Sequence, residues 1–415
     1  MIKKFSSILT ALSLSFLVAC GSNPTQTASP ESTGKPGNEK ITVTWWNSVD
    51  DEAEAKALDD LVAKYEKANP NVKIEQSFVP FSDIKNKLLT SSVGNELPDI
   101  VWLDNPDHQS FAAAGILADI TKEVQEWGQS NQYFEGPWSS TVLKDKSYGV
   151  PVSSNNLALI YNEKMLKDAG IQPPKTWDEL KEAAKNLTKS GVYGLGVAAK
   201  QNETATFQLL PWIWQAGSDL NSFDSQGTID AIKFWKDLVD NGYMSKEVIN
   251  LKHGDLSLQF ASQKVAMMVN GTWNLGSDLK DAKFEWNAVP LPSYKQSATI
   301  LGGFNWAITS QSKQKEAAWD FIKFANEPDN IREFVKTSGR LPSRKDMIQE
   351  PNWQDNKIMK VFADSMENSR ARSYGPNYPK ISSAVQEMVQ SVLTGVKSPE
   401  DAVKDANAKI KPLLQ

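Results

Sequence analysis

The side chains that could do chemistry in this 415-residue chain are tryptophans and short polar residues rather than catalytic groups. There are 14 Trp but only 2 His and 1 Cys, too few ligands for a zinc or iron centre. The sequence has no G-x-S-x-G elbow, no phosphate-binding G-x-x-x-x-G-K-[ST] loop and no H-E-x-x-H motif. His108 and His253 stand alone, and we expect each to be a surface or capping residue. These features predict a binding protein rather than an enzyme, with no cofactor and no metal.

Aromatic rings combined with short polar side chains suit the recognition of a sugar. Pyranose rings present apolar CH faces that stack on aromatic rings, and their hydroxyl groups need Asp, Asn, Glu or Arg partners. The net charge of −5 argues against a nucleic-acid partner, which requires a concentrated basic surface. A glycoside hydrolase needs only two carboxylates, and a count of 50 acidic residues does not exclude such a pair.

The first part of the chain predicts an α/β lobe with a largely parallel sheet. Strand-like runs at 41–46, 72–78 and 100–103 alternate with helical patterns at 52–68 and 82–92. In such sheets ligands lie beyond the carboxyl ends of the strands. This rule selects Trp46 and Asn47 after the first strand, and Asp104 and Asn105 after the third. The alternatives are that Asp104 only caps the following helix and that Trp46 packs beneath a covering helix.

A polar patch at 153–156 separates two apolar runs, 148–152 and 157–161. This pattern predicts a crossing between two lobes, with Asn155 facing the gap. We expect two further crossings, at 287–292 and 343–351. Gly302 and Gly303 interrupt a strand at 299–309, which indicates a bulge or a ligand lying against the backbone.

The segment 204–217 is rich in aromatic residues, including Phe207, Trp212 and Trp214. The two tryptophans are two positions apart and cannot share one face of a helix. We expect one in the core and the other at the ligand, with Trp212 at the ligand.

The N-terminus has the composition of a secretory signal. Lysines at 3 and 4 precede a mostly apolar run, 5–18, which is shorter than the roughly 20 residues of a membrane span. Leu17-Val18-Ala19-Cys20 resembles a bacterial lipobox, and this resemblance implies that Cys20 is lipidated and becomes the mature N-terminus. The alternative is a plain signal peptide cut near Ala19. Residues 21–40 are rich in Ser, Thr, Pro, Asn and Gly and predict a disordered tether.

Several motifs resemble one known family. The runs LALIYNEKML at 157–166, PPKTWDEL at 173–180, PDIVWLDN at 98–105 and GRLPSR at 339–344 are similar to those of bacterial extracellular solute-binding proteins of the carbohydrate type, the maltodextrin-binding-like group that serves ABC importers. The resemblance implies a two-lobed periplasmic-binding-protein-like α/β fold with hinge crossings and a central cleft. It also implies that Trp273, after the turn at Gly271, projects into the cleft and that the loop with Arg372 and Tyr374 approaches the ligand. The alternative for Trp273 is that it only packs on the following helix.

The expected organisation has four parts: a lipoprotein signal peptide at 1–20, a tether at 21–40, an N-terminal lobe of 41–149 plus 290–345, and a C-terminal lobe of 150–289 plus 346–415. The expected function is that of a lipid-anchored, monomeric, extracytoplasmic protein that closes on a sugar or oligosaccharide and delivers it to the membrane subunits of an ABC importer. A non-sugar solute such as a glycerol phosphodiester is an alternative, and it would require a cationic cleft. A glycoside hydrolase and a lipoprotein that binds other proteins are the remaining alternatives.

Overall fold

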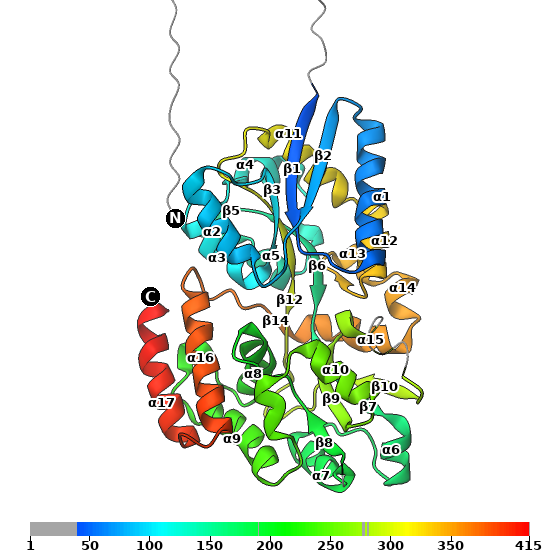
Figure 1. The fold of residues 1–415 in the computed structure, drawn as a ribbon, viewed down its shortest axis with the longest axis vertical. Coiled ribbons are helices and arrows are strands. Elements are labelled where there is room, and N and C mark those ends of the chain that lie inside the picture. Colours follow the sequence, from blue (N-terminus) through cyan, green and yellow to red (C-terminus); the bar gives the residue numbers. More distant parts are fainter. Residues whose placement is uncertain (1–39, 190, 276–278, 280–281, 415) are drawn as a thin grey trace, which may run out of the picture. The chain divides into compact units, whose positions relative to one another are not determined.

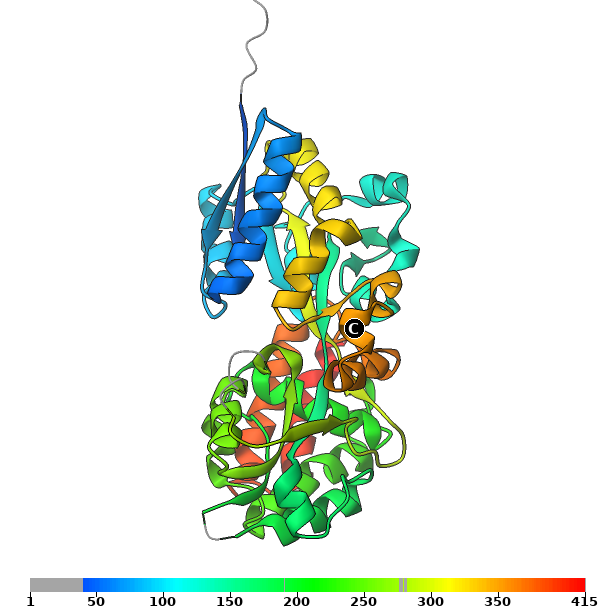
Figure 2. The same ribbon diagram turned by 90° about the vertical axis from the view of Figure 1, so that its right-hand side faces the viewer.

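A computed structural model describes residues 40–189, 191–275, 279 and 282–414. Two main sheets, each covered by helices, account for most of this part of the chain (Figures 1 and 2). The larger sheet has six strands in the order β13-β6-β12-β3-β1-β2. Its strands are β1 (Ile41–Asn47), β2 (Val72–Phe78), β3 (Ile100–Asp104), β6 (Val150–Asn155), β12 (Gly302–Ile308) and β13 (Leu341–Pro342).

The second sheet has four strands in the order β10-β7-β9-β8. They are β7 (Leu157–Asn162), β8 (Tyr193–Gly196), β9 (Val265–Gly271) and β10 (Trp286–Val289). Two small sheets pair β4 (Val142–Leu143) with β5 (Lys146–Ser147), and β11 (Thr299–Ile300) with β14 (Ser369–Arg370). We call the six-stranded sheet with its helices the first lobe, and the four-stranded sheet with its helices the second lobe.

The α-helices of the described residues are α1 (Glu52–Ala68), α2 (Ile84–Gly94), α3 (Asn105–Ala113), α4 (Thr121–Trp127), α5 (Glu135–Ser139), α6 (Glu163–Asp168), α7 (Trp177–Leu187), α8 (Glu203–Gln215), α9 (Gln226–Asp240), α10 (His253–Ala261), α11 (Lys315–Ala325), α12 (Pro328–Thr337), α13 (Lys345–Ile348), α14 (Pro351–Gln354), α15 (Lys357–Asp364), α16 (Tyr378–Leu393) and α17 (Pro399–Ile410). None of the helices in these described ranges is both long and apolar enough to cross a membrane.

The predicted strand–helix alternation at the start of the chain is confirmed. Strand β1 pairs in parallel with β2 on one side and with β3 on the other, while β12 runs antiparallel to both β3 and β6. The carboxyl ends of β1, β2 and β3 therefore share one edge with the last residue of β6 and the first residue of β12. We call this the carboxyl edge of the first lobe.

The first predicted crossing lies slightly later than expected. Strand β6 pairs with β12 and β13 in the first lobe, whereas β7 pairs with β9 and β10 in the second, and only Asn156 lies between them. The prediction that 150–155 belongs to the second lobe is wrong, because hydrogen bonds on both sides of β6 hold this strand in the six-stranded sheet. The remaining lobe boundaries stay a prediction.

Most of the tryptophans form the cores. Trp45, Trp102 and Trp306 pack together on the face of the first sheet that α1, α11 and α12 cover, with Trp45 lying 4.8 Å from Trp306 between ring centroids. Helices α2 and α3 cover the opposite face (Figure 1). The high tryptophan content therefore reflects core packing as much as a ligand site.

Candidate ligand site

The carboxyl edge of the first lobe brings predicted residues from three strands together. Gly302 pairs with Asn155, and Phe304 pairs with Asp104 two residues further along β12. An ideal Cβ on Gly302 would lie 2.2 Å from Asn155 Oδ1, so any side chain at this position would displace the asparagine. Gly303 has φ +143°, and an ideal Cβ there would lie 2.0 Å from the carbonyl oxygen of Ser153. The paired glycines therefore allow close backbone approach beside Asn155.

Arg372 links this edge to the second lobe. Its guanidinium is buried, with Nη1 donating to Glu203 Oε1 at 2.5 Å and Nη2 donating to Asn105 Oδ1 at 3.1 Å. Asp104 Oδ1 lies 3.8 Å from Nη2. Asn105 begins α3 in the first lobe and Glu203 begins α8 in the second, so one cation contacts both lobes.

Glu203 is held by further hydrogen bonds from α16. The hydroxyls of Tyr378 and Ser382 donate to its two carboxylate oxygens, each at 2.5 Å. Burial, and next the charge of Glu203, raise the pKa of Tyr378 well above its ordinary value, so the phenol remains a donor. Glu203 is therefore a fixed acceptor that sets the position of Arg372.

The polar cluster as a whole is not cationic. Lys85 of α2 pairs with Asp107 of α3 at 2.7 Å, beside Arg372, Asp104 and Glu203. Burial raises the pKa of Asp104 to about 7, although Arg372 acts in the opposite direction. Burial also raises the pKa of Asp107. Two cations thus face three carboxyl groups, which suits a neutral ligand better than an anion.

Three rings from the second lobe form an aromatic wall beside Arg372. The guanidinium carbon of Arg372 lies 4.7 Å from the ring centroid of Phe207. Trp273 lies 5.9 Å from Phe207 and 5.2 Å from His253, both edge to face. Burial, and next the charge of Arg372, lower the pKa of His253 to about 4, so its imidazole is neutral at pH 7. Rings in this arrangement can stack on the apolar faces of a sugar.

Some polar atoms around the cluster have no partner within the described part of the chain. They are Asn155 Oδ1, Arg372 Nε, His253 Nε2 and Thr272 Oγ1, all buried. A buried polar atom without a hydrogen bond costs free energy, so these atoms are suited to receive the groups of a ligand. The same described ranges contain no cluster of His, Cys, Asp and Glu arranged to hold a metal ion.

Not every predicted site residue lies in this cluster. The structure joins Asp104, Asn105, Asn155, Gly302 and Arg372 through the contacts given above, and Gly303 adjoins them. Trp273 joins them through Phe207.

Trp46 and Asn47 have structural contacts of their own. The ring of Trp46 lies beneath α2, with Lys87 Nζ 4.0 Å from its centroid, as in the alternative considered from sequence. Asn47 is buried and bonds to Gln76 and to the backbone of Val49.

Trp212 is a core residue, and the expectation that it faces a ligand is not supported. It is 1% exposed and packs 5.3 Å from the rings of both Trp177 and Phe234. Trp214 is also buried, but its indole N–H donates to Asp219 Oδ2 at 3.1 Å. Both tryptophans lie in the second half of α8, whereas the residues of this helix that contact Arg372, Glu203 and Phe207, lie in its first half.

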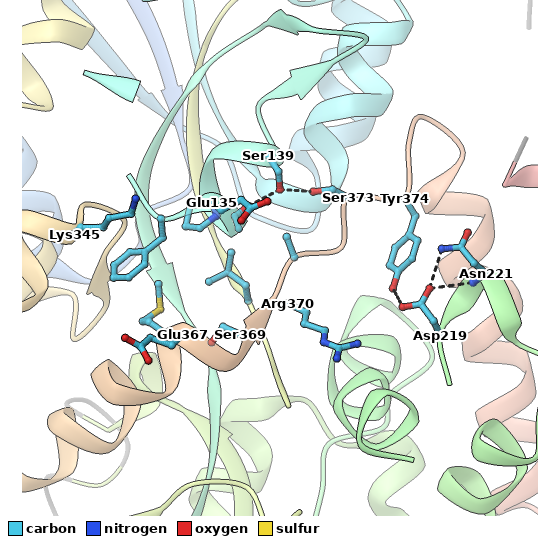
Figure 3. A pocket seen from close by; sticks show the side chains of 16 residues that line it. Glu135, Ser139, Asp219, Asn221, Lys345, Glu367, Ser369, Arg370, Ser373 and Tyr374 are labelled. Atoms are coloured by element: carbon cyan, nitrogen blue, oxygen red, sulfur yellow. Dashed lines mark hydrogen bonds between the residues drawn. The ribbon is translucent and has the colours of Figure 1, made fainter. Parts of the chain in front are cut away.

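Tyr374 lies on the other side of the loop that carries Arg372. A cavity of about 730 Å³ opens there, drawn in Figure 3, and Tyr374 donates to Asp219 Oδ2 at 2.9 Å at its border. Ser139 of α5 and Ser373 lie 3.1 Å apart across the same cavity. Side chains of the segment 369–374 line the cavity, except Arg372, which bonds to the cluster instead. The buried polar atoms that lack a partner among the described residues, and the rings of Phe207 and Trp273, lie on the Arg372 side of this loop.

Sequence reasoning overlooked Glu203, Phe207 and His253 as site residues. Glu203 and Phe207 are four positions apart in α8 and so share a helix face, which is the signal that the sequence offered. His253 had no signal, because its neighbours Phe207 and Trp273 come from distant segments. His108, expected at the surface or at a cap, is fully buried, and burial lowers its pKa to about 4.

Comparisons with known proteins agree with this architecture. Residues 60–361 match the family described as bacterial extracellular solute-binding protein. An ABC transporter solute-binding protein of Thermotoga lettingae, solved with α-D-tagatose, is 27% identical with a TM-score of 0.82, covering 90% of this chain and 100% of its own. The cyclic α-maltosyl-1,6-maltose binding protein of Arthrobacter globiformis is 28% identical with a TM-score of 0.80, covering 90% of this chain and 99% of its own. The maltotriose-binding protein of Pyrococcus abyssi is 24% identical over 389 residues, 90% of this chain and 81% of its own.

The predicted family and the predicted two-lobed α/β fold are confirmed by these matches. The relatives are binding components rather than enzymes, and the family acts outside the cytoplasm. The chain belongs to the bacterial extracellular solute-binding proteins.

Proposed function

We propose that this protein captures a sugar or oligosaccharide at the Arg372 cluster and delivers it to an ABC importer. The observation that carries the proposal is that Asn155 Oδ1 and Arg372 Nε, which have no partner among the described residues, lie near the rings of Phe207 and Trp273. The polar atoms can form hydrogen bonds with the hydroxyl groups of a sugar, and the aromatic rings can stack on the CH faces of a pyranose. The sugars named for the relatives from Thermotoga lettingae and Arthrobacter globiformis support the same ligand class.

The charge balance disfavours a phosphodiester ligand. Arg372 is already paired with Glu203 and Asn105, and Lys85 with Asp107. A phosphate group would have to displace these partners and lie near three carboxyl groups. A neutral polyhydroxylated ligand meets no such penalty.

We further propose that the ligand is captured by closure of the two lobes. A ligand held both by Asn155 of the first lobe and by Phe207 and Trp273 of the second has differential affinity for a closed form, which is the requirement for shifting such an equilibrium. The crossings at Asn156, between β10 and β12, and between β13 and α15 are the segments expected to bend.

The lipid anchor completes the proposal. Cys20 lies outside the described residues, and the lipobox resemblance at 17–20 supports its lipidation. Two or more acyl chains on one cysteine give stable membrane attachment. A monomer on a tether of residues 21–40 would then stay close to the importer in the same membrane.

The ligand proposal is tested by isothermal calorimetry with a panel of mono- and oligosaccharides. We expect at least one sugar to bind and Asn155→Ala to weaken it about 10-fold, since a buried hydrogen bond is lost. Asn186→Ala, at an exposed position of α7, is the matched control and should leave affinity unchanged. Absence of binding to every sugar, or binding of glycerol phosphodiesters instead, would overturn the proposal.

Closure and anchoring have separate tests. Small-angle scattering should show a smaller radius of gyration when the bound sugar is added, and an unchanged radius would reject closure. Labelling with radioactive palmitate in bacterial cells should modify the full chain but not Cys20→Ser. Equal labelling of both, or of neither, would reject the anchor.

A further inference from the structure

The carboxyl edge of the first lobe continues well beyond the Arg372 cluster. In the strand order β6-β12-β3-β1-β2, the residues at this edge are Asn155, Gly302, Asp104, Asn47 and Phe78. Neighbouring strands lie about 4.8 Å apart, so the edge spans about 19 Å from β6 to β2. This length exceeds what one sugar ring can occupy.

Two large apolar rings stand exposed at the far end of the edge. Phe78 is 53% exposed and Phe81, just before α2, is 47% exposed. The ring of Phe81 is held edge to face against Phe304 at 6.0 Å and 87°. Phe304 in turn stacks on Trp102 of the core at 6.1 Å and 22°. Phe81 is therefore an exposed ring with a fixed orientation, supported from the core outward.

Polar groups lie beside the packed rings of Phe81 and Phe304, as a sugar would require. The guanidinium carbon of Arg340 lies 5.3 Å from the centroid of Phe304, and its Nη1 pairs with Glu54 Oε2 at 2.7 Å. Both side chains are only 14% exposed. Arg340 Nε is buried without a partner among the described residues. A donor and an acceptor thus adjoin the rings.

The rings of Phe81 and Phe304 adjoin the Arg372 cluster along the carboxyl edge. Phe304 follows Gly302 and Gly303 directly along β12. Gly339, next to Arg340, lies so close to the second lobe that an ideal Cβ would be 3.1 Å from the carbonyl oxygen of Thr272, the residue before Trp273. The wall of the site therefore runs from Trp273 past Arg340 to Phe81.

We propose that Phe81 stacks on a second sugar unit and that the ligand of this protein is an oligosaccharide rather than a single ring. Phe304 is the positioning residue that holds Phe81. This inference rests on the proposed function. It adds the length of the ligand and names Phe81 as the residue that distinguishes an oligosaccharide from a single sugar.

The test is calorimetry of the full chain with maltotriose, cellotriose and raffinose, each compared with its constituent monosaccharides. Phe81→Ala should weaken the tightest-binding oligosaccharide about 3- to 10-fold, the loss of one stacked ring, and change monosaccharide affinity less than about 2-fold. Phe81→Trp should retain the affinity. Leu89→Ala is the control, because Leu89 is 49% exposed on the neighbouring α2.

A double-mutant cycle separates positioning from direct contact. Phe304→Leu should reduce oligosaccharide affinity, and adding Phe81→Ala should cause little further loss, because the two rings act as one unit. Equal losses for mono- and oligosaccharides, fully additive losses, or monosaccharide binding as tight as oligosaccharide binding would overturn the inference while leaving sugar capture intact. If none of these sugars or any other in the wider panel binds, the proposed function fails and this inference fails with it.

Discussion

At the scale of single residues, Asp104 shows how burial changes the chemistry of an ordinary side chain. Its carboxyl group ends β3 at the carboxyl edge and lies 3.8 Å from Arg372. Burial outweighs that cation and raises the pKa of Asp104 to about 7. The folded protein therefore holds a proton at Asp104 that the unfolded chain releases near pH 4.

This difference makes the stability of the protein depend on pH. Between pH 4 and pH 7 the folded state binds more protons than the unfolded state, so the contribution of Asp104 to the free energy of unfolding falls as pH rises. Asp104→Asn should remove this slope. The free energy of unfolding of the variant minus that of wild type should therefore be about 1–3 kcal/mol larger at pH 8 than at pH 4. Urea unfolding across that range, without ligand, measures it.

Asp119→Asn is the control for this measurement. Hydrogen bonds from Lys146, and next from Thr121, lower the pKa of Asp119 to about 2, so its contribution to the free energy of unfolding changes mainly below pH 4. Its removal should leave the slope from pH 4 to pH 8 as in wild type. A wild-type slope in Asp104→Asn would contradict the burial argument.

Gly302 is the residue at which a single methyl group should matter most to binding. The Cβ of Gly302→Ala would lie 2.2 Å from Asn155 Oδ1, which must then move away from the ligand. We expect sugar affinity to fall at least about 10-fold and stability to fall by about 1–3 kcal/mol. Gly94→Ala, where the nearest atom is the flexible side chain of Glu96 at 3.5 Å, should change neither. Calorimetry measures the sugar affinity of both variants, and thermal unfolding measures their stability. Unchanged affinity in Gly302→Ala would show that Asn155 does not contact the ligand.

At the scale of secondary structure, the first turns of α8 organise the site. Asn202 caps the helix by accepting from the backbone N–H of Thr204 at 3.0 Å. Glu203 and Phe207, four residues apart, then lie on one face and reach Arg372 together. The rest of α8 is core, which is why Trp212 and Trp214 are buried.

Removing the charge of Glu203 should destabilise this arrangement. Arg372 is buried, and Glu203→Gln would replace its 2.5 Å charged partner with a neutral amide, leaving Asn105 and the more distant Asp104 beside it. We expect a loss of about 3 kcal/mol in the free energy of unfolding, as for other broken buried ion pairs. Glu182→Gln removes an exposed pair with Lys185 at 2.9 Å and should change the free energy of unfolding far less, because solvent screens that pair. Equal losses from the two variants in urea unfolding would show that Glu203 is not an anchor.

At the scale of the whole molecule, the segment 369–374 has two different faces. Arg372 bonds into the ligand cluster, while Arg370, Ser373 and Tyr374 line the cavity on the opposite side. Arg370 lies over the ring of Trp214 at 5.8 Å. A movement of the lobes about this segment would change the contacts of Arg372 and the shape of the cavity at the same time.

The contact between Gly339 and Thr272 gives a test of lobe closure. The Cβ of Gly339→Ala would lie 3.1 Å from the carbonyl oxygen of Thr272 in the other lobe, so it should hinder closure and weaken sugar affinity about 3- to 10-fold. Gly395→Ala is the matched control, since both glycines have positive φ, +61° and +78°, but nothing lies within 4 Å of a Cβ on Gly395. Both variants should lose similar stability from backbone strain. Equal affinities in calorimetry would show that this contact has no part in binding.

The sequence by itself determined the alternation of strands and helices, the crossing near Asn155 and the residue types that a sugar needs. These follow from local patterns: strand ends, paired glycines and polar breaks between apolar runs depend only on neighbours in the chain. The shared carboxyl edge of parallel strands also placed the ends of β1 and β3 together, but not the end of β6, which the sequence assigned to the other lobe.

Only the tertiary structure decided which of those residues meet. Trp46 and Trp212 are the same residue type as Trp273, yet they lie beneath α2 and in the core, because burial depends on what packs against each face. Asp104 became a proton-holding group, and distant Phe207 and His253 joined the site, through contacts with Arg372 and Trp273 across many residues. Distances between segments that are far apart in the chain, and the desolvation that results, are not encoded in any local pattern.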